Sequence, residues 1–148
     1  YAALEIFKPD VVQIPFSIFD QRLLLDGTLN YLQNLGIEIH ARSIFLQGLL
    51  LMAPNELDDY FAPFLPSMRS WRDICSDLNL LPLELALYFV ISRPYIDKVI
   101  IGISNLCQLK EIISSVKADR SGIDDFPFYK LAHTSERLLN PTLWNLKL

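Results

Sequence analysis

Charged residues are scarce in this sequence, and the basic ones are scattered. Only 20% of the 148 residues are Asp, Glu, Lys or Arg, and the formal net charge is −4. No run of lysine or arginine occurs anywhere in the chain. Because nucleic-acid binding requires a concentrated positive surface, the sequence predicts no nucleic-acid partner.

Cysteine and histidine are also sparse, with two residues of each. Cys75 and Cys107 lie far apart in the chain, which fits neither a metal-binding spacing nor a disulfide framework. His40 and His133 form no metal-ligand pattern with the scattered acidic residues. We therefore predict two reduced thiols, a cytoplasmic location and no metal site.

Long apolar runs are missing as well. The longest candidates are interrupted by Gln47, Glu84 or Arg93 before they reach the roughly 18–20 residues of a membrane-spanning helix. Tyr1–Glu5 lacks the charged segment that precedes the apolar core of a signal peptide. The sequence therefore predicts no membrane segment. Its first residue, a tyrosine rather than a methionine, leads us to expect a piece of a longer protein.

Apolar side chains, by contrast, are abundant. The chain is 51% hydrophobic, and its mean hydropathy is +0.27. A self-contained soluble domain usually carries about a quarter charged residues. The apolar excess fits either one densely packed α/β domain with buried strands or a surface that a partner covers. The length itself indicates a single domain.

Short β-branched runs predict three strands: Val11–Ile14, Ile37–Ala41 and Val99–Ile101. Apolar residues at helical spacing predict the helices. The expected helices are Tyr1–Phe7, Leu23–Leu35, Met68–Leu78, one that begins at Pro82, one that runs from Ser104 or Asn105 to about Val116, and Phe128–Leu139. Loops are expected at Phe16–Gln21 and Asp119–Pro127. Alternating strands and helices indicate parallel βαβ units, either in a sheet with an exposed edge or in part of a larger barrel.

The stretch from Gly36 to Leu51 is the most informative part of the chain. An alternation of apolar and polar residues, typical of a half-buried strand, ends at Arg42 and Ser43. An apolar run around Gly48 follows. This pattern is typical of a strand whose carboxyl end opens onto a site. In α/β folds, ligands bind at that end of the strands.

Three segments carry a family resemblance. They are Asp10–Arg22 (DVVQIPFSIFDQR), Gly36–Leu50 (GIEIHARSIFLQGLL) and Val99–Ile113 (VIIGISNLCQLKEII). In this order they resemble the sixth, seventh and eighth strand segments of the aldo/keto reductase family. The resemblance covers about Ala2–Val116 and leaves residues 117–148 as a C-terminal extension.

The resemblance implies an α/β fold that is the C-terminal portion of a (β/α)8 TIM barrel. The family reduces aldehydes and ketones with NADPH, less often NADH, and the cofactor lies across the carboxyl ends of the strands. Its catalytic Asp, Tyr, Lys and His come from earlier strands. The resemblance therefore implies that this chain retains cofactor-binding residues and lacks the catalytic ones.

Several residues match the family's cofactor-binding positions. Gln13 matches the glutamine whose amide holds the nicotinamide carboxamide, and an amide suits this role because it both donates and accepts. Arg42 stands where many members stack an aromatic ring on the nicotinamide, and it either stacks there, contacts an anion or is an ordinary surface residue. The remaining matches are Ser43, Phe45, Gln47 and Gly48 for the pyrophosphate loop, and Gly102, Ser104, Asn105, Gln108 and Glu111 for the adenosine end.

Two functions stay open at this point. The first is an NAD(P)H-dependent oxidoreductase acting on a small carbonyl compound, of which this chain is a part. The polar stretch Asp20-Gln21-Arg22 leads to the hypothesis of a hydrophilic substrate. The second is a non-catalytic interaction or regulatory module, which self-associates through exposed sheet edges.

Overall fold

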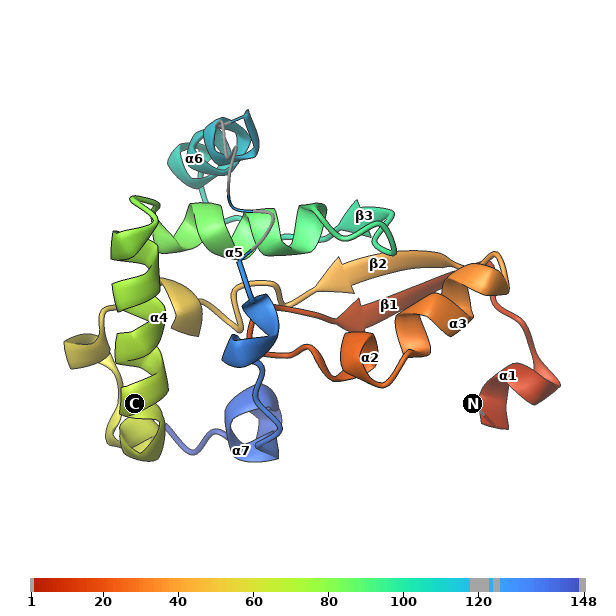
Figure 1. Cartoon of the computed structure of the whole chain (residues 1–148), viewed down its shortest axis with the longest axis horizontal. Coiled ribbons are helices and arrows are strands. Elements are labelled where there is room, and N and C mark those ends of the chain that lie inside the picture. The colour runs from red at the N-terminus through yellow and green to blue at the C-terminus, as the bar shows by residue number, and fades with distance from the viewer. Residues whose placement is uncertain (1, 118–122, 124–125, 147–148) are drawn as a thin grey trace.

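The structure is a computed structural model that describes residues 2–117, 123 and 126–146. Its regular elements are α1 (Ala2–Ile6), β1 (Val11–Pro15), α2 (Arg22–Leu25), α3 (Thr28–Asn34), β2 (Glu38–Arg42), α4 (Leu65–Asp77), α5 (Pro82–Ile91), β3 (Lys98–Val99), α6 (Leu106–Lys117) and α7 (Glu136–Leu139). Short 3-10 turns lie at Leu49–Leu51, Pro54–Glu56, Asp59–Phe64, Phe128–Leu131 and Pro141–Leu143. Figure 1 shows the strands and helices in chain order.

The three strands form one parallel sheet in the order β1-β2-β3 (Figure 1). Pro15 is aligned with Arg42, and Ala41 is aligned with Val99. The carboxyl ends of all three strands therefore lie at the same edge of the sheet. The parallel α/β prediction is confirmed, and the third strand is shorter than expected, although the Ile100 N–H still donates to the Ala41 carbonyl at 2.8 Å.

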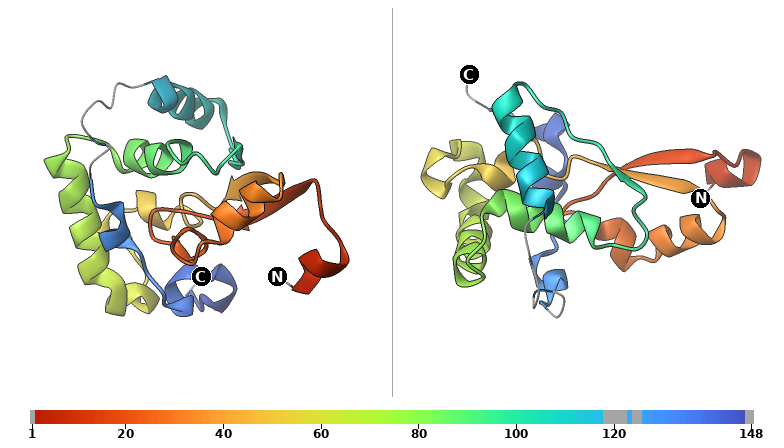
Figure 2. Two further views of the ribbon diagram at one scale, coloured as in Figure 1. Left: turned by 45° about the vertical axis from the view of Figure 1, so that its right-hand side comes forward. Right: turned by 90° about the horizontal axis from the view of Figure 1, so that it is seen from above.

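The two faces of the sheet differ in their chemistry. Ile14, Ile39 and Ala41 are buried on the face that α3 and α5 cover (Figure 2). The opposite face is open and polar, and there Glu38 pairs with both His40 and Lys98, each at 2.6 Å. The hydrogen bond from His40, followed by that from Lys98, lowers the pKa of Glu38.

An aromatic core joins the sheet to the helices beyond its carboxyl ends. Phe16 stacks on Phe89 with ring centroids 5.3 Å apart, and Phe89 meets Phe128 edge-on at 5.4 Å. Phe19 meets the edge of Trp71 at 6.3 Å, and all of these rings are buried. Such pairs add to the stability that their burial provides.

The segment that follows β1 is a buried loop. A loop was predicted at Phe16–Gln21, and all six of its residues are buried. Ser17 Oγ accepts from the Asp20 N–H at 3.0 Å, and the Gln21 side-chain amide donates to the carbonyls of Ile18 and Phe128 at 2.6 and 2.7 Å. The polar groups of this segment are therefore satisfied inside the protein.

The prediction of one helix over Leu23–Leu35 is wrong. The segment forms two short helices, α2 and α3, which are separated at Asp26 and Gly27. Gly27 has a φ of 81°, a left-handed conformation that ends α2 and redirects the chain. Apolar periodicity alone does not reveal this break, because Leu23 and Leu24 of α2 pack against the same core as Leu29 and Leu32 of α3.

The prediction of one helix over Phe128–Leu139 is also wrong. The chain makes a 3-10 turn over Phe128–Leu131, runs extended, and then forms α7. The extended part is fixed by the core, since the His133 N–H donates to the Phe19 carbonyl at 2.8 Å. Most of the loop expected at Asp119–Pro127 lies outside the described residues.

Both cysteines are free, Cys75 being buried and Cys107 exposed, and burial raises the pKa of the Cys75 thiol to about 12. Within the described residues, three or more His, Cys, Asp or Glu side chains nowhere gather as a metal site would require.

No single described helix has the length and apolarity of a membrane span. The helical stretches Asp59–Asp77 and Pro82–Ile91 meet these criteria only when taken together, and they are bent by 89°.

Gln21→Ala is expected to lower the free energy of unfolding by about 1–3 kcal/mol, because it leaves two buried carbonyls without donors. Urea denaturation followed by circular dichroism measures this loss. Asn30→Ala on the exposed side of α3 is the matched control and should stay within about 0.5 kcal/mol of the parent protein. Equal stability of Gln21→Ala and the parent protein would contradict the stabilising role of these two hydrogen bonds.

Candidate functional site

A cavity of about 580 Å³ lies at the carboxyl ends of β2 and β3. Its size falls within the range of small-molecule and cofactor sites. Nine of the eleven residues predicted for the site line it: Arg42, Ser43, Phe45, Gln47, Gly48, Gly102, Ser104, Gln108 and Glu111. Apolar residues form the rest of its wall: Ile44, Leu51, Leu83, Ile100, Ile101 and Ile112.

The loop that follows β2 has an unusual backbone. Ser43, Leu46 and Gln47 have φ values of 57°, 49° and 55°, and Gly48 has a φ of 87°. Left-handed conformations of residues other than glycine cost about 1–3 kcal/mol each and persist only where the surrounding structure enforces them. Here the buried side chains of Ile44 and Leu46 enforce them.

This loop presents backbone N–H groups that have no internal acceptor. Those of Leu46 and Gly48 donate to the carbonyls of Ser43 and Phe45 at 2.8 and 3.0 Å. Those of Ile44, Phe45 and Gln47 have no hydrogen-bond acceptor among the described residues. Backbone N–H groups that converge where right- and left-handed residues alternate form concave binding sites for anions.

The helix α4 holds the end of this loop in place. Trp71 Nε1 donates to the Leu50 carbonyl at 2.9 Å, and Arg72 Nη2 donates to the Leu51 carbonyl at 2.6 Å. Trp71 is fully buried. The loop conformation is therefore maintained by the core as well as by its own turns.

Arg42 is the cation of this cavity. It follows Ala41 at the end of β2, its side chain is exposed, and its Nη1 lies 3.4 Å from Ser43 Oγ. It forms no ion pair with any residue that the structure describes. Its guanidinium is therefore available to an anion or to the face of a planar ring.

The first turn of α6 forms the other end of the cavity. Asn105 Oδ1 accepts from the Gln108 N–H at 3.0 Å, and Gln108 Oε1 accepts from the Ser104 N–H at 2.8 Å. Asn105 is thus the N-cap of α6, and it is one of the two residues at which the sequence predicted this helix to begin. It does not line the cavity, whereas Ser104, Gln108 and Glu111 do.

Gln13 is the second predicted residue that lies outside the cavity. It is exposed on the open face of the sheet, where it is aligned with His40 on β2. Arg42 lies two residues beyond His40 and therefore on the same face, because side chains along a strand alternate between faces. Gln13 and Arg42 thus lie on the same face of the sheet. Gln13 pairs with His40, and Arg42 is the next residue of β2 after His40 on that face.

Sequence reasoning missed a second, smaller cavity of about 360 Å³. It adjoins the first one, since Arg42, Ser43 and Gln47 line both. The C-terminal segment completes its wall through Glu136, Leu139, Asn140, Pro141 and Thr142. Nothing in the sequence indicates that these residues meet the end of β1.

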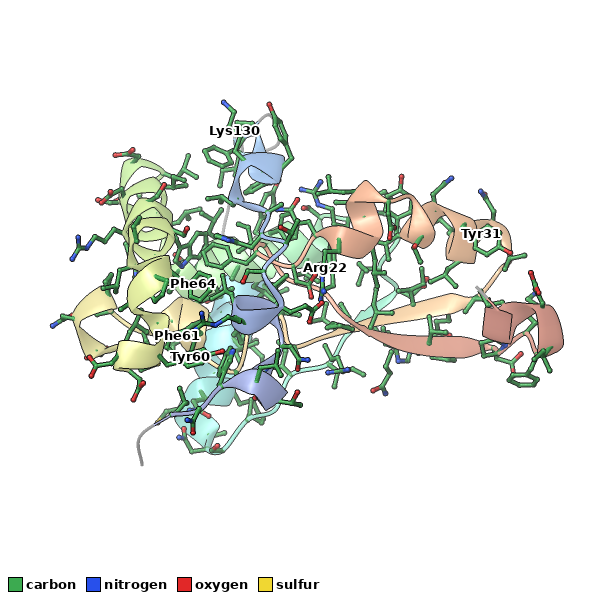
Figure 3. All side chains as sticks on the ribbon, turned by 90° about the horizontal axis from the view of Figure 1, so that it is seen from below. Arg22, Tyr31, Tyr60, Phe61, Phe64 and Lys130 are labelled. Atoms are coloured by element: carbon green, nitrogen blue, oxygen red, sulfur yellow. The ribbon has the colours of Figure 1, made fainter. Side chains whose placement is uncertain are left out.

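An ion cluster joins the C-terminal segment to the rest of this second cavity. Arg22 binds both carboxylate oxygens of Asp20, Nε to Oδ1 at 2.8 Å and Nη2 to Oδ2 at 2.9 Å, and it also pairs with Glu136. Figure 3 shows Arg22 between the sheet and this segment. The hydrogen bonding that Arg22 donates to Asp20 is the main cause of the raised pKa of Arg22.

The two cavities offer binding groups but few proton donors. None of their described lining residues is a Tyr, Lys or His, and the carboxyl groups of Asp20, Glu111 and Glu136 are the lining groups that serve as proton donors in other enzymes. The larger cavity combines apolar walls, unpaired N–H groups and one cation. Such a lining suits an elongated ligand that has both flat rings and phosphates.

Comparison with known proteins identifies the family. The family model described as "Aldo/keto reductase family" matches residues 2–126. The chain belongs to the aldo/keto reductase family. No curated protein sequence matches the chain significantly.

Solved structures show the same fold. The chain resembles the apo form of aldo-keto reductase AKR11C1 from Bacillus halodurans with a TM-score of 0.70 and 20% identity, over 90% of this chain and 47% of that one. The holo form of that enzyme gives a TM-score of 0.65 at 20% identity, over 90% and 46%. The thermostable aldo-keto reductase Tm1743 in complex with the inhibitor epalrestat gives 0.57 at 16% identity, over 82% and 39%.

These matches define the architecture as a partial (β/α)8 barrel. The chain spans about half the length of the aldo-keto reductases that it matches. Three parallel strands with helices on one face are what a segment of such a barrel contains. The open polar face of the sheet corresponds to the interior of the barrel.

Asn105→Ala is expected to lower the free energy of unfolding by about 1 kcal/mol, because the Gln108 N–H loses its cap. Thermal and urea unfolding measure the change. Ser114→Ala on the exposed part of α6 is the control and should have little effect. An unchanged stability of Asn105→Ala would contradict its assignment as the N-cap.

Proposed function

We propose that this chain forms the cofactor-binding part of an NAD(P)H-dependent reductase that acts on a small aldehyde or ketone. The observation that carries the proposal is the loop at Ser43–Gly48, which lines the 580 Å³ cavity and contains three N–H groups without an acceptor among the described residues. Family membership supports it, since the residues of this loop match the family's pyrophosphate segment. The nine matched residues that gather around one cavity support it further.

The residues divide along the cavity by their chemistry. The N–H groups of Ile44, Phe45 and Gln47 would hold the pyrophosphate, since backbone donors suffice to bind phosphate oxygens. Arg42 lies at the nicotinamide end of this loop, together with Gln13 on the same sheet face. The first turns of α6 form the adenosine end.

The bound reduced nicotinamide supplies a hydride to the carbonyl carbon of the substrate. The residues of this chain hold and orient the dinucleotide for that step. The carbonyl oxygen also needs a proton. Of the described residues that line the two cavities, Asp20, Glu111 and Glu136 belong to the usual proton donors, and Asp20 and Glu136 are already paired with Arg22. In our proposal the proton donor belongs to a part of the enzyme outside this chain.

Arg42→Ala is expected to weaken dinucleotide binding about tenfold, because it removes the cation beside the loop. Isothermal titration calorimetry with NAD⁺ and NADP⁺ measures the affinity. Arg69→Ala, an exposed arginine of α4 outside both cavities, is the charge-matched control and should bind as the parent does. Equal weakening by both substitutions would argue against a specific site.

Gly48→Val is expected to weaken binding by a similar factor, for a conformational reason. Nothing lies within 4 Å of a Cβ placed at Gly48, so its left-handed φ of 87° is the obstacle, and a β-branched residue shifts the loop and its N–H groups. Gly27→Val, at a comparable φ of 81° but outside both cavities, is the control for loss of stability. Unchanged affinity in a folded Gly48→Val protein would contradict the role of the loop.

Carbonyl reduction is expected only when this chain is combined with the part of a family member that carries the catalytic Asp, Tyr, Lys and His. We would follow NADPH and NADH oxidation at 340 nm with a small aldehyde, using the chain alone, the complementary half alone and the mixture. Activity in the mixture alone supports the proposal. Full activity of the separate chain would overturn it.

The second candidate function is a non-catalytic interaction module. Two observations favour it. Gln13 is exposed on the polar face of the sheet, and the outer edges of β1 and β3 have no partner strand among the described residues. Open edges pair readily with another chain. Size-exclusion chromatography separates the two functions, since a tight dimer that binds no dinucleotide favours the module.

A further inference from the structure

The helix α6 carries apolar side chains on more of its surface than the described part of the chain covers. It packs against α5, and Ile112 contacts the core while Ser115 is buried. Figure 2 (left) shows α6 at the periphery of the molecule, on the outer side of α5. The core of this chain therefore accounts for one side of α6 only.

Four apolar residues of α6 follow one another at intervals of three and four positions, which places them on a common side of the helix. We call them the α6 stripe: Leu106, Leu109, Ile113 and Val116. The exposed fractions of Leu106, Ile113 and Val116 are 62, 46 and 48%. A seam of this period is typical of a helix that packs lengthwise against a second helix. Because it is open to solvent, the α6 stripe has the character of an interaction surface.

Two lysines border the α6 stripe. Lys110 and Lys117 are exposed, and each follows a residue of the stripe, Leu106 or Ile113, by four positions. Neither lysine forms an ion pair with a residue that the structure describes. In paired helices, the charges beside the apolar seam select the partner. The surface therefore fits an amphipathic helix that has Asp or Glu beside its own apolar side.

The outer edge of β3 is open on the same side of the fold. β3 pairs with β2, and its other edge has no partner strand among the described residues. In a parallel sheet, each strand is followed by a helix that crosses over with a fixed hand. A parallel strand added beside β3 would therefore bring its helix to the side of α6 that lies away from α5. One added βα unit would cover the strand edge and the α6 stripe together.

We propose that the α6 stripe and the edge of β3 dock a βα unit whose helix carries acidic residues beside its apolar side, and that this unit belongs to the part of the barrel outside this chain. The inference rests on the proposed function, in which this chain is one part of a larger enzyme. The chain covers 47% of one matched aldo-keto reductase, so more than half of that protein lies outside the match. Part of the 51% apolar content of the sequence thereby has a location and a purpose.

A synthetic helical peptide tests the surface directly. The probe is roughly three heptads long, with leucine at both seam positions and glutamate beside them, and fluorescence anisotropy measures its binding. The chain should bind it at least about tenfold more tightly than a peptide with lysine beside the seam. Ile113→Lys should weaken this binding about tenfold, and Lys110→Glu combined with Lys117→Glu should reverse the preference between the peptides.

Tyr129→Lys is the matched control for the loss of an exposed apolar side chain. Tyr129 is 62% exposed and lies outside α6, so its substitution should leave peptide binding unchanged. Ile113→Lys should unfold at the same urea concentration as the parent protein, because Ile113 is exposed in the separate chain. This measurement separates a loss of docking from a loss of folding.

Co-expression identifies the occupant. The tagged chain is produced together with the half of a family member that carries the catalytic residues, and light scattering after size exclusion gives the composition of the purified complex. The parent chain and Tyr129→Lys should recover the complementary half, and Ile113→Lys should recover about tenfold less of it.

The outcomes separate the inference from the proposed function. A glutamate-flanked peptide that does not bind, or recovery of the complementary half that Ile113→Lys leaves intact, would overturn the inference. A dimer of the chain alone that Ile113→Lys dissociates would make a second copy the occupant and would also overturn it. Titration with NAD⁺ reports on the proposed cofactor site independently, since that site can bind or fail to bind the dinucleotide whatever the α6 stripe does.

Discussion

The parallel pairing of three short strands is the constraint on which the rest of this structure depends. The ladder aligns Pro15 with Arg42 and Ala41 with Val99. Parallel strands require long connections that return to the same end of the sheet, so the chain must leave every strand at one edge. Residues that lie some sixty positions apart, such as Arg42 and Gly102, are thereby brought to one cavity. A shift of β2 by one residue would exchange its buried and open faces and separate these groups.

The location of the cavity could be predicted from the sequence, but the backbone conformation of the loop that lines it could not. The alternation in Ile37–Ala41 and the apolar run after Ser43 predict a strand that ends at a site, and the cavity lies there. Family resemblance then selects the lining residues. The backbone conformation of the loop could not be predicted in this way, because Leu46 and Gln47 have left-handed φ values that such residues rarely adopt. Their conformation is imposed by tertiary packing, which local propensity does not report.

The C-terminal segment shows where sequence reasoning fails and why. Its helix was predicted over Phe128–Leu139, yet contacts with distant residues decide its path. The Gln21 amide binds the Phe128 carbonyl across 107 positions, and Arg22 binds Glu136 across 114. No local pattern encodes such pairings, and each of them outweighs the modest preference of this stretch for a helix. The smaller cavity, which this segment completes, was missed for the same reason.

The shared wall between the two cavities has a consequence of its own. Arg42 lines both cavities, and a guanidinium that is hydrogen-bonded to one anion has fewer N–H donors left for a second. Occupancy of either space by a negative group therefore alters the field in the other, and thermodynamic linkage makes that influence equal in both directions. An anion bound beside the C-terminal segment and a dinucleotide bound beside the loop would thus change each other's affinity through the side chain of Arg42.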